Sequence, residues 1–269
     1  MNSRRLIAMI AGASRRSLGL VCVVLVGAIA SPAQKSANTI TITANGSAKL
    51  LTVEGKPVIQ LTPSAAGQAG SAFTSNSVSF NPNYTFSVFF QFLMTKTGGS
   101  GAADGMTFVL QTEGANALGA SGGAEGYGTS SSTGTGPGGI SPSVAVEFDT
   151  AQNPWDSNDN HVAVLTNGQM IDLDSQTPYG VSGCASAPPH TFGCLSNGDV
   201  WSVWVDYDGT DLNVAVADNS TTRPANLISY PIDVAGILGQ SSAFVGFTAG
   251  TGSGFQAHFV FGIDGIPGL

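Results

Sequence analysis

The sequence predicts an all-β protein folded as an antiparallel β-sandwich. Only 10% of its 269 residues are charged and 36 are glycines, a composition typical of many-stranded proteins with polar loops. From Thr39 onward, short runs of β-branched and aromatic residues alternate with turn signals. The chain shows no repeat and no helical period longer than a turn or two, so we expect two packed sheets rather than a helical core.

Each predicted strand is a short run of β-branched and aromatic residues that is bounded by turn signals. Roughly eleven runs meet this description, a number that suits the two sheets of a sandwich. In chain order they cover residues 40–44, 58–61, 77–80, 84–94, 106–112, 143–149, 161–165, 200–207, 212–217, 243–248 and 257–263.

The segment between the fifth and sixth of these runs has a different composition. Gly114 to Gly139 consists largely of Gly, Ser and Thr, and such a segment is not expected to build a core. We therefore predict a mobile or ligand-facing loop here.

The N-terminus has the features of a signal peptide. Four arginines precede an apolar run from Leu18 to Ile29, and the run ends in an A-x-A cleavage pattern at Ala28–Ala30. We expect residues 1–30 to be removed, leaving a domain of residues 31–269 that is secreted, extracellular or periplasmic and not inserted in a membrane. An uncleaved N-terminal anchor is the alternative, although the run is short for a span of about 20 residues.

Removal of residues 1–30 makes the protein strongly acidic. The full chain has nine basic and 17 acidic residues; the leader carries four of the basic ones and none of the acidic ones, so the net charge becomes 5 − 17 = −12. A nucleic-acid partner is disfavoured by this charge.

Two of the three cysteines remain after export. Cys22 lies in the leader, which leaves Cys184 and Cys194 as an even pair. We predict a disulfide between them, because exported proteins oxidise such pairs. A metal site that includes His190 is the alternative, but Pro188-Pro189 favours a stapled turn.

The most informative segment is 143–161, which reads SVAVEFDTAQNPWDSNDNH. Side chains alternate along a strand, so Val144, Val146 and Phe148 are predicted to point into the sandwich. Glu147 and Asp149 then share the opposite face, where their mutual repulsion raises a pKa or favours a bound cation.

The residues that follow extend this pair into a metal-site hypothesis. Asp149, Asn153 and Asp156 offer the oxygen ligands that calcium prefers, and Glu147 with His161 offers a mixed site for a transition metal. The competing interpretation is a hairpin loop decorated with acidic and amide side chains. An EF-hand is excluded, because His161 occupies the position where that loop needs glycine.

The same residues resemble the metal-binding signature of the legume (L-type, concanavalin A-like) lectins, in a bacterial-type secreted form. The resemblance runs over roughly residues 37 to 265 and implies the jelly-roll sandwich of that family. The motifs that carry it, in the family's order, are AVEFDT-x-x-N-x-WD-x4-H at 145–161, ADGMTF at 103–108, GG-x-x-G at 122–126 and VGFTA-x-TG at 245–252.

The resemblance also implies ligands and a function, namely non-catalytic, calcium-dependent sugar binding. Calcium would be held by Asp149, the carbonyl of Ala151, Asn153 and Asp156, and manganese or a similar ion by Glu147, Asp149, Asp156 and His161. The sugar would contact the side chains of Asp104, which follows a cis peptide bond, and Asn153. It would also contact the backbone amide of Gly123 and, from a variable loop, the backbone of Ser253 and Gly254.

One departure from the family pattern keeps other functions open. Ala151 stands where the family usually has an aromatic residue that stacks on the sugar. Tyr127 or Trp155 could supply that surface instead, although Trp155 is expected to pack structurally under the metal loop. A secreted structural or adhesion protein with architectural metals is therefore one alternative. The other is a glycoside hydrolase of related fold, but Gln152 occupies the position of the required acid. Weak single-site binding would also favour a homo-oligomer.

Overall fold

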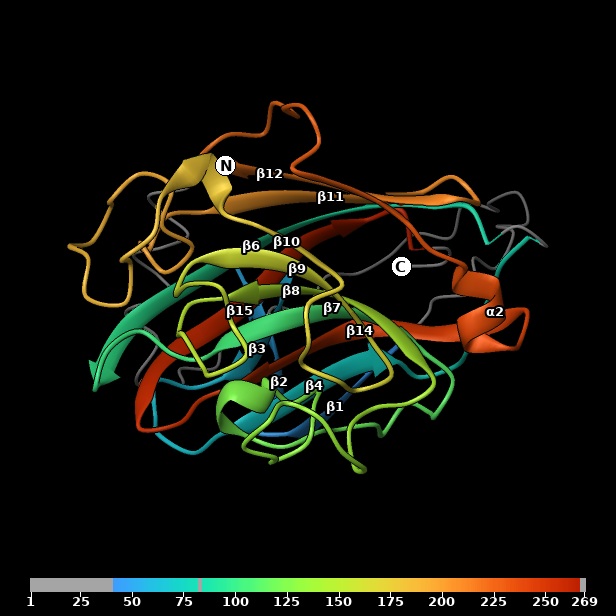
Figure 1. Cartoon of the computed structure of the whole chain (residues 1–269), viewed down its shortest axis with the longest axis horizontal. Helices are drawn as coiled ribbons and strands as arrows, with labels where there is room; N and C mark the ends of the chain where they lie inside the picture. The colour runs from blue at the N-terminus through green and yellow to red at the C-terminus, as the bar shows by residue number, and fades with distance from the viewer. Residues whose placement is uncertain (1–40, 82–83, 267–269) are drawn as a thin grey trace, which may run out of the picture.

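The computed structural model describes residues 41–81 and 84–266. The predicted signal peptide, residues 1–30, lies outside this described part of the chain. Figure 1 shows two layers of strands, with β11 and β12 along the upper edge of the view and α2 at one end. This is the predicted antiparallel β-sandwich.

Each layer is one sheet in which all neighbouring strands are antiparallel. The first has the order β1-β4-β14-β7-β8-β9-β10, with β5 paired to β14, and the second has the order β13-β12-β11-β6-β15-β3-β2. The strands of the first sheet are β1 (Ile42–Gly46), β4 (Ala69–Thr74), β5 (Val78–Ser79), β7 (Gly105–Gln111), β8 (Ser143–Asp149), β9 (His161–Thr166), β10 (Asp174–Gln176) and β14 (Ser242–Gly250). Those of the second are β2 (Lys49–Val53), β3 (Lys56–Thr62), β6 (Phe86–Gly99), β11 (Trp201–Tyr207), β12 (Asp211–Asp218), β13 (Ile228–Pro231) and β15 (Gly254–Asp264).

Aromatic side chains join the two sheets. The ring of Phe90 on β6 lies 4.9 Å from that of Phe247 on β14, 5.7 Å from that of Phe108 on β7 and 5.9 Å from that of Phe148 on β8, measured between centroids. All four rings are almost fully buried. Aromatic pairs at these separations contribute beyond their buried area, so this cluster holds β8, the strand with the paired carboxylates, against the second sheet.

Helical structure in the described residues is limited to three short elements. These are α2 (Val234–Leu238) and the 3-10 turns η1 (Gly122–Ala124) and η2 (Pro178–Gly180). Asp233 caps α2 by accepting a hydrogen bond from the Gly236 amide. None of the described helices is long and apolar enough to cross a membrane.

The predicted runs correspond to eleven of the strands, but four strands were missed. β2, β4, β10 and β13 are between three and six residues long, and they lack the longer apolar pattern by which strands are recognised.

The expectation that Gly114–Gly139 builds no core was wrong. Ala117 and Tyr127 are buried in a second cluster with Ala145 and Ala163, on the side of the first sheet that faces away from the second sheet. The segment folds back on itself, since the amides of Gly119 and Gly126 donate to the carbonyls of Gly126 and Ala120. Backbone packing of this kind needs small residues. The glycine-rich composition therefore belongs to an ordered segment that packs on the first sheet.

Candidate metal centre and ligand cleft

The predicted division of β8 into two faces is confirmed. Val144, Val146 and Phe148 belong to the main core between the sheets. Glu147 and Asp149 project from the other face, yet they are only 1% and 2% exposed because the Gly114–Gly139 segment covers them. The strand therefore places two carboxylates in a buried environment.

The register of β8 and β9 brings the predicted metal ligands together. Asp149, the last residue of β8, pairs directly with His161, the first residue of β9. In the loop between them, the amide of Ala151 donates to Oδ1 of Asp149 at 2.7 Å, and the amide of Asn153 donates to Oδ2 of Asp156 at 2.5 Å. These bonds hold the loop side chains beside the end of β8.

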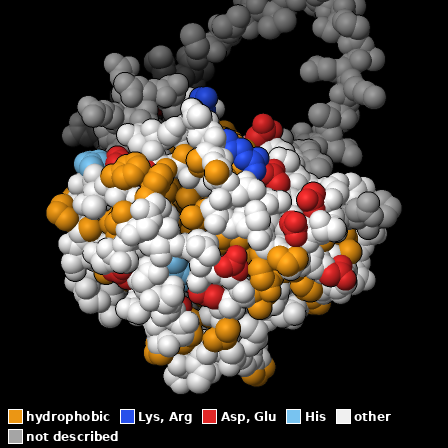
Figure 2. All heavy atoms as spheres, turned by 45° about the horizontal axis from the view of Figure 1, so that its top comes forward, with side chains coloured by type: hydrophobic (Ala, Val, Ile, Leu, Met, Phe, Trp, Pro, Cys, Tyr) orange, Lys and Arg blue, Asp and Glu red, His pale blue; other side chains and the backbone are white. Residues whose placement is uncertain are grey.

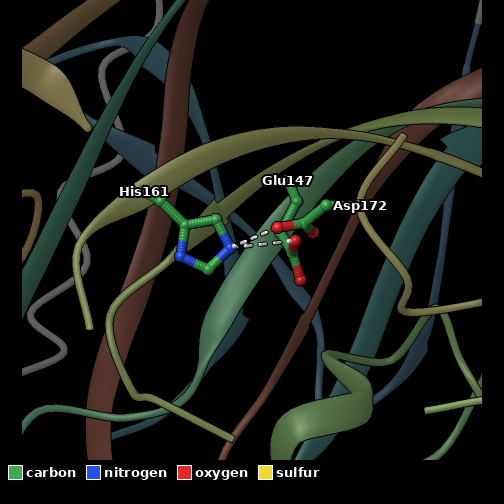
Figure 3. A group of neighbouring side chains, drawn as sticks. All are labelled: Glu147, His161 and Asp172. Atoms are coloured by element: carbon green, nitrogen blue, oxygen red, sulfur yellow. Dashed lines mark ion pairs between the residues drawn. The ribbon is translucent and has the colours of Figure 1, made fainter. Parts of the chain in front are cut away.

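His161 is oriented so that one ring nitrogen is available to a metal. Its Nδ1 lies 3.0 Å from the carbonyl oxygen of Asn158, an atom that can only accept, so Nδ1 carries the hydrogen. Its Nε2 points between Oε2 of Glu147 and Oδ2 of Asp172, at 3.6 Å from each (Figure 3). A backbone acceptor that fixes the tautomer in this way is typical of metal-binding histidines.

Asp172 was not among the predicted ligands. It lies between β9 and β10, and its side chain is 13% exposed. Nothing in its local sequence distinguishes it from a surface aspartate, because only the return of the chain past β9 places it beside His161.

Several polar atoms of this centre lack hydrogen-bond partners. Six buried atoms of this region have no hydrogen-bond partner among the described residues. They are Oδ2 of Asp104, Oε2 of Glu125, Oε2 of Glu147, Oδ1 of Asp156, Nε2 of His161 and Oδ1 of Asp172. No ion pair with Lys or Arg reaches these acids in the described part of the chain. Uncompensated buried charges are strongly unfavourable.

The ligand atoms are close enough to share cations. They form three groups in which all ligand atoms lie within 4.8 Å of one another: Glu147, His161 and Asp172; Asp149, Asp156 and His161; and Glu125, Glu147 and Asp149. A divalent cation in such a group would satisfy the orphaned atoms and neutralise the repulsion, so these residues fit a metal centre.

The pKa values of these residues reflect the surplus of buried acids. Burial raises the pKa of Glu147 to about 7 even though His161 opposes the shift, and burial together with Glu147 raises the pKa of Asp149 well above its usual range. Burial alone would lower the pKa of His161, but the neighbouring carboxylates of Glu147, Asp172 and Asp156 outweigh it and raise that pKa to about 9.

A cleft of about 580 Å³ opens beside the metal centre. Asp104, Asn153, Ser253 and Gly254, four of the residues expected to contact sugar, line it. Gly123 lies at its edge, because a Cβ on Gly123 would fall 2.4 Å from Oδ1 of Asn153. The structure thus brings these five residues, drawn from four separate segments, into one region.

Asp104 is the buried carboxylate of this cleft. It is 8% exposed, and the Ala103–Asp104 peptide bond is cis, as predicted. Its carbonyl accepts hydrogen bonds from the amide and hydroxyl of Thr150, at 2.9 and 2.6 Å. Burial raises the pKa of the Asp104 carboxyl to about 6, although the Gly252 amide opposes the shift.

The two aromatic residues proposed as a sugar platform do not line the cleft. Tyr127 is fully buried, and its hydroxyl is bonded to Ser143 and to the Gly168 amide, so the expectation for Tyr127 was wrong. Trp155 packs against the second cluster, close to Gly134. All residues lining the described cleft are non-aromatic, and Ala151 is one of them.

The predicted disulfide is confirmed, and its neighbours Gly183 and Ala185 line the cleft. Cys184 and Cys194 are bonded, with their Cα atoms 5.5 Å apart. The carboxylate of Asp159 accepts from the amides of Gly183 and Ala185, at 2.7 and 2.8 Å, and this ties the disulfide loop to the β8–β9 loop. The disulfide therefore restrains a loop that lines the cleft.

Comparison with known proteins gives consistent results. The model of the legume lectin domain family matches residues 33–264. Two similar proteins, both from Arabidopsis thaliana, are a probable L-type lectin-domain containing receptor kinase I.5, 29% identical over 81% of this chain, and a probable inactive receptor kinase III.1 of the same type, 33% identical over 76%. The chain spans only about a third of their length, 32% and 33% respectively.

Solved structures agree with this match at the level of the fold. The metal-free form of lectin I-B4 from Griffonia simplicifolia superposes with a TM-score of 0.64 at 22% identity, covering 82% of this chain and 91% of that one. At this identity the likeness concerns the fold alone.

Proposed function

Because the chain belongs to the legume lectin domain family, we propose that it binds glycans in the cleft beside Asp104, in a calcium-dependent manner. The family consists of non-catalytic carbohydrate-binding domains, and this chain corresponds to the lectin part of its kinase relatives. One observation carries the calcium dependence: the cleft shares Asn153 with a cluster of buried acids that outnumber His161 and that no Lys or Arg of the described residues reaches.

Calcium would be held by Asp149, the carbonyl of Ala151, Asn153 and Asp156. This is an all-oxygen set, which suits calcium. Asn153 is also a cleft residue, so an ion bound here would fix an amide that the ligand contacts. The Asn153 side chain donates to the Ala151 carbonyl at 3.1 Å, so these two proposed ligand groups lie next to each other.

Manganese or a similar transition metal would be held by Glu147, Asp149, Asp156 and His161. The free Nε2 of His161 favours such an ion over a second calcium. Asp172 is an additional candidate ligand, since its carboxylate lies 3.6 Å from this nitrogen. That distance is too long for a hydrogen bond and leaves room for an ion between the two.

Sugar hydroxyls would be recognised by Asp104, Gly123, Asn153, Ser253 and Gly254. A carboxylate such as Asp104 can accept from two neighbouring hydroxyls, whereas the amide groups donate to the same oxygens. An epimer that leaves one of these polar groups unpaired loses about 1 to 3 kcal/mol. Ala151 stands at the position where the family usually has an aromatic residue, so the residues lining the described cleft offer no ring for stacking on a sugar.

The protein's location and assembly are part of the same proposal. Residues 1–30 would direct export and be cleaved, leaving a lectin domain of residues 31–269 outside the cytoplasm. On the face drawn in Figure 2, acidic side chains are spread over the surface whereas Lys and Arg are confined to one area, which suits a neutral glycan better than a nucleic acid. Self-association would raise the avidity of a weak single site.

A glycan array, probed with calcium and manganese present and again with EDTA, tests the proposal. We expect binding to a restricted set of glycans that EDTA abolishes and added calcium restores. Metal uptake without glycan binding would instead favour a structural or adhesion protein. That alternative is kept because no aromatic residue lines the described cleft. Release of free sugar would indicate the hydrolase, although Gln152 at the acid position donates only to the Ser157 carbonyl.

A further inference from the structure

Glu125 is a buried carboxylate that the proposed ligand sets do not use. It follows the η1 turn with a φ of 53° and is 1% exposed. Its side chain lies over Gly105 on β7, where a Cβ would fall 1.8 Å from Oε1 of Glu125. The absence of a side chain at Gly105 is therefore what admits the Glu125 carboxylate to the metal centre.

The position of this carboxylate relative to β8 is the key geometric fact. One ligand oxygen from each of Glu125, Glu147 and Asp149 lies within 4.8 Å of the other two. All three side chains are at most 2% exposed, and Oε2 of Glu125 has no hydrogen-bond partner among the described residues. Three acids at this spacing repel one another, and the effect is strong because water is excluded.

We propose that Glu125 is a direct ligand of a divalent cation that it shares with Glu147 and Asp149, and that this bond anchors the η1 turn to the metal centre. The inference rests on the proposed function, because it adds a ligand to the same centre. Three carboxylates form an all-oxygen set, so the ion is a hard cation such as Ca²⁺ or Mn²⁺.

The anchor has a consequence for the cleft. Gly123, which precedes Glu125 in the η1 turn, lies at the edge of the cleft next to Asn153. Hydrogen bonds already hold the turn to β14, since the hydroxyl of Thr248 donates to the Glu125 carbonyl at 2.7 Å and the Gly122 amide donates to Thr251. A metal bond from Glu125 would make the position of this edge depend on ion occupancy.

The competing explanation is that Glu125 stays protonated and takes no part in ion binding. Removing its carboxylate would then leave metal affinity unchanged. The two explanations also differ for Glu125→Leu, in which an apolar side chain replaces a buried acid. Under both, the metal-free protein gains thermal stability, but only ligation predicts that the gain on adding metal becomes smaller.

Calorimetric titration of the chelated protein with CaCl₂ and with MnCl₂ tests the proposal. The variants are Glu125→Gln, which keeps the shape, and Glu125→Leu. The exposed Glu54→Gln has the same charge change on the β2–β3 turn and serves as the control. We expect both Glu125 variants to lose about tenfold or more in affinity for at least one ion, a loss typical of changes at a metal site, and Glu54→Gln to match the unaltered protein.

Hydrogen exchange supplies a second readout. In the unaltered protein, metal should slow exchange at the amides of residues 122–128, and in Glu125→Leu this protection should be lost. The inference is overturned if the Glu125 variants have the same metal affinities and the same metal-dependent amide exchange as the unaltered protein. If the unaltered protein binds neither ion, the metal centre of the proposed function fails as well. If it binds ions and glycans normally and the Glu125 variants do too, only the role of Glu125 is refuted.

Discussion

Asp149 and His161 face each other across the β8–β9 pair, with Nδ1 of His161 3.8 Å from Oδ2 of Asp149. The eleven-residue loop from 150 to 160 thus begins and ends at two of the proposed metal ligands. The same loop lines the cleft through Ala151, Gln152 and Asn153. The predictions below follow from this arrangement, in which one loop connects the metal centre to the cleft.

Removal of metal should lower both stability and glycan binding. An ion bound only by the native state stabilises it by about 2.7 kcal/mol when its free concentration is about 100-fold above its Kd. We expect EDTA to lower the melting temperature in calorimetry and to abolish glycan binding, and calcium with manganese to restore both. Glycan binding that persists in excess EDTA would contradict the calcium dependence.

The stability of the chelated protein should fall as pH rises. Folding raises the pKa of Asp104 to about 6 and of Glu147 to about 7, so the stability due to their protonated forms is complete below about pH 4 and is lost through pH 6 to 7. His161, with a raised pKa of about 9, extends the loss to alkaline pH. The other acids facing these groups, Glu125, Asp149, Asp156 and Asp172, have pKa values raised in the same direction.

The metal-loaded protein should behave in the opposite way, because metal displaces these protons. The gain in melting temperature on adding calcium and manganese should therefore grow between pH 5 and pH 8. Urea unfolding at several pH values, with and without EDTA, measures both trends. A chelated protein whose stability rises over this pH range would refute the assignment of these acids as a cluster in need of cations.

Asp104→Asn should weaken glycan binding while leaving metal affinity close to that of the unaltered protein. The amide keeps the shape but replaces one acceptor oxygen with a donor, which costs about 1 to 3 kcal/mol or roughly 5- to 150-fold in affinity. Titration with a glycan identified on the array measures the loss. Ser253→Ala is the matched control, since Ser253 is proposed to contact sugar through its backbone. Equal affinities in both variants would remove Asp104 from the site.

Gly123→Ala should impair the cleft for a steric reason. The added Cβ would fall 2.4 Å from Oδ1 and 2.5 Å from Nδ2 of Asn153, so either the η1 turn or Asn153 must move. We expect weaker glycan binding together with weaker calcium binding, because Asn153 serves both. Ser121→Ala, on the other side of Gly122 and without a capping bond to η1, should leave both affinities unchanged in the same titrations.

Loss of the disulfide should lower the free energy of unfolding and loosen a loop that lines the cleft. In the chain-entropy account, closing a loop with a sequence separation of 10 contributes about 3 kcal/mol. Replacing Cys184 and Cys194 together with serine should therefore reduce the unfolding free energy by about this amount in urea titrations. A double variant with unaltered stability would show that the contacts of Asp159 hold the loop alone.

The fold and the clustering of acids with His161 at the β8–β9 connection could be predicted because their signals are local. Alternation along 143–149 separates Val146 from Glu147 whatever the rest of the chain does. The four missed strands had no such signal. Each is short, and each is defined by pairing with a neighbour, as β10 is by β9. Glu125 and Asp172 were missed for a related reason, because each is an isolated acid in a segment without periodicity.

The sequence by itself determined the sandwich, the disulfide pair and the metal-ligand pattern, since each depends on residue type and spacing along one stretch of chain. Only the tertiary structure decided which distant acids join that pattern and which aromatic residues reach the cleft. The register of β7 on β8 sets Gly105 opposite Asp149 and so makes room for Glu125, while the folding of the Gly114–Gly139 segment buries Tyr127. Packing between segments far apart in the chain fixes these contacts, and no local pattern records it.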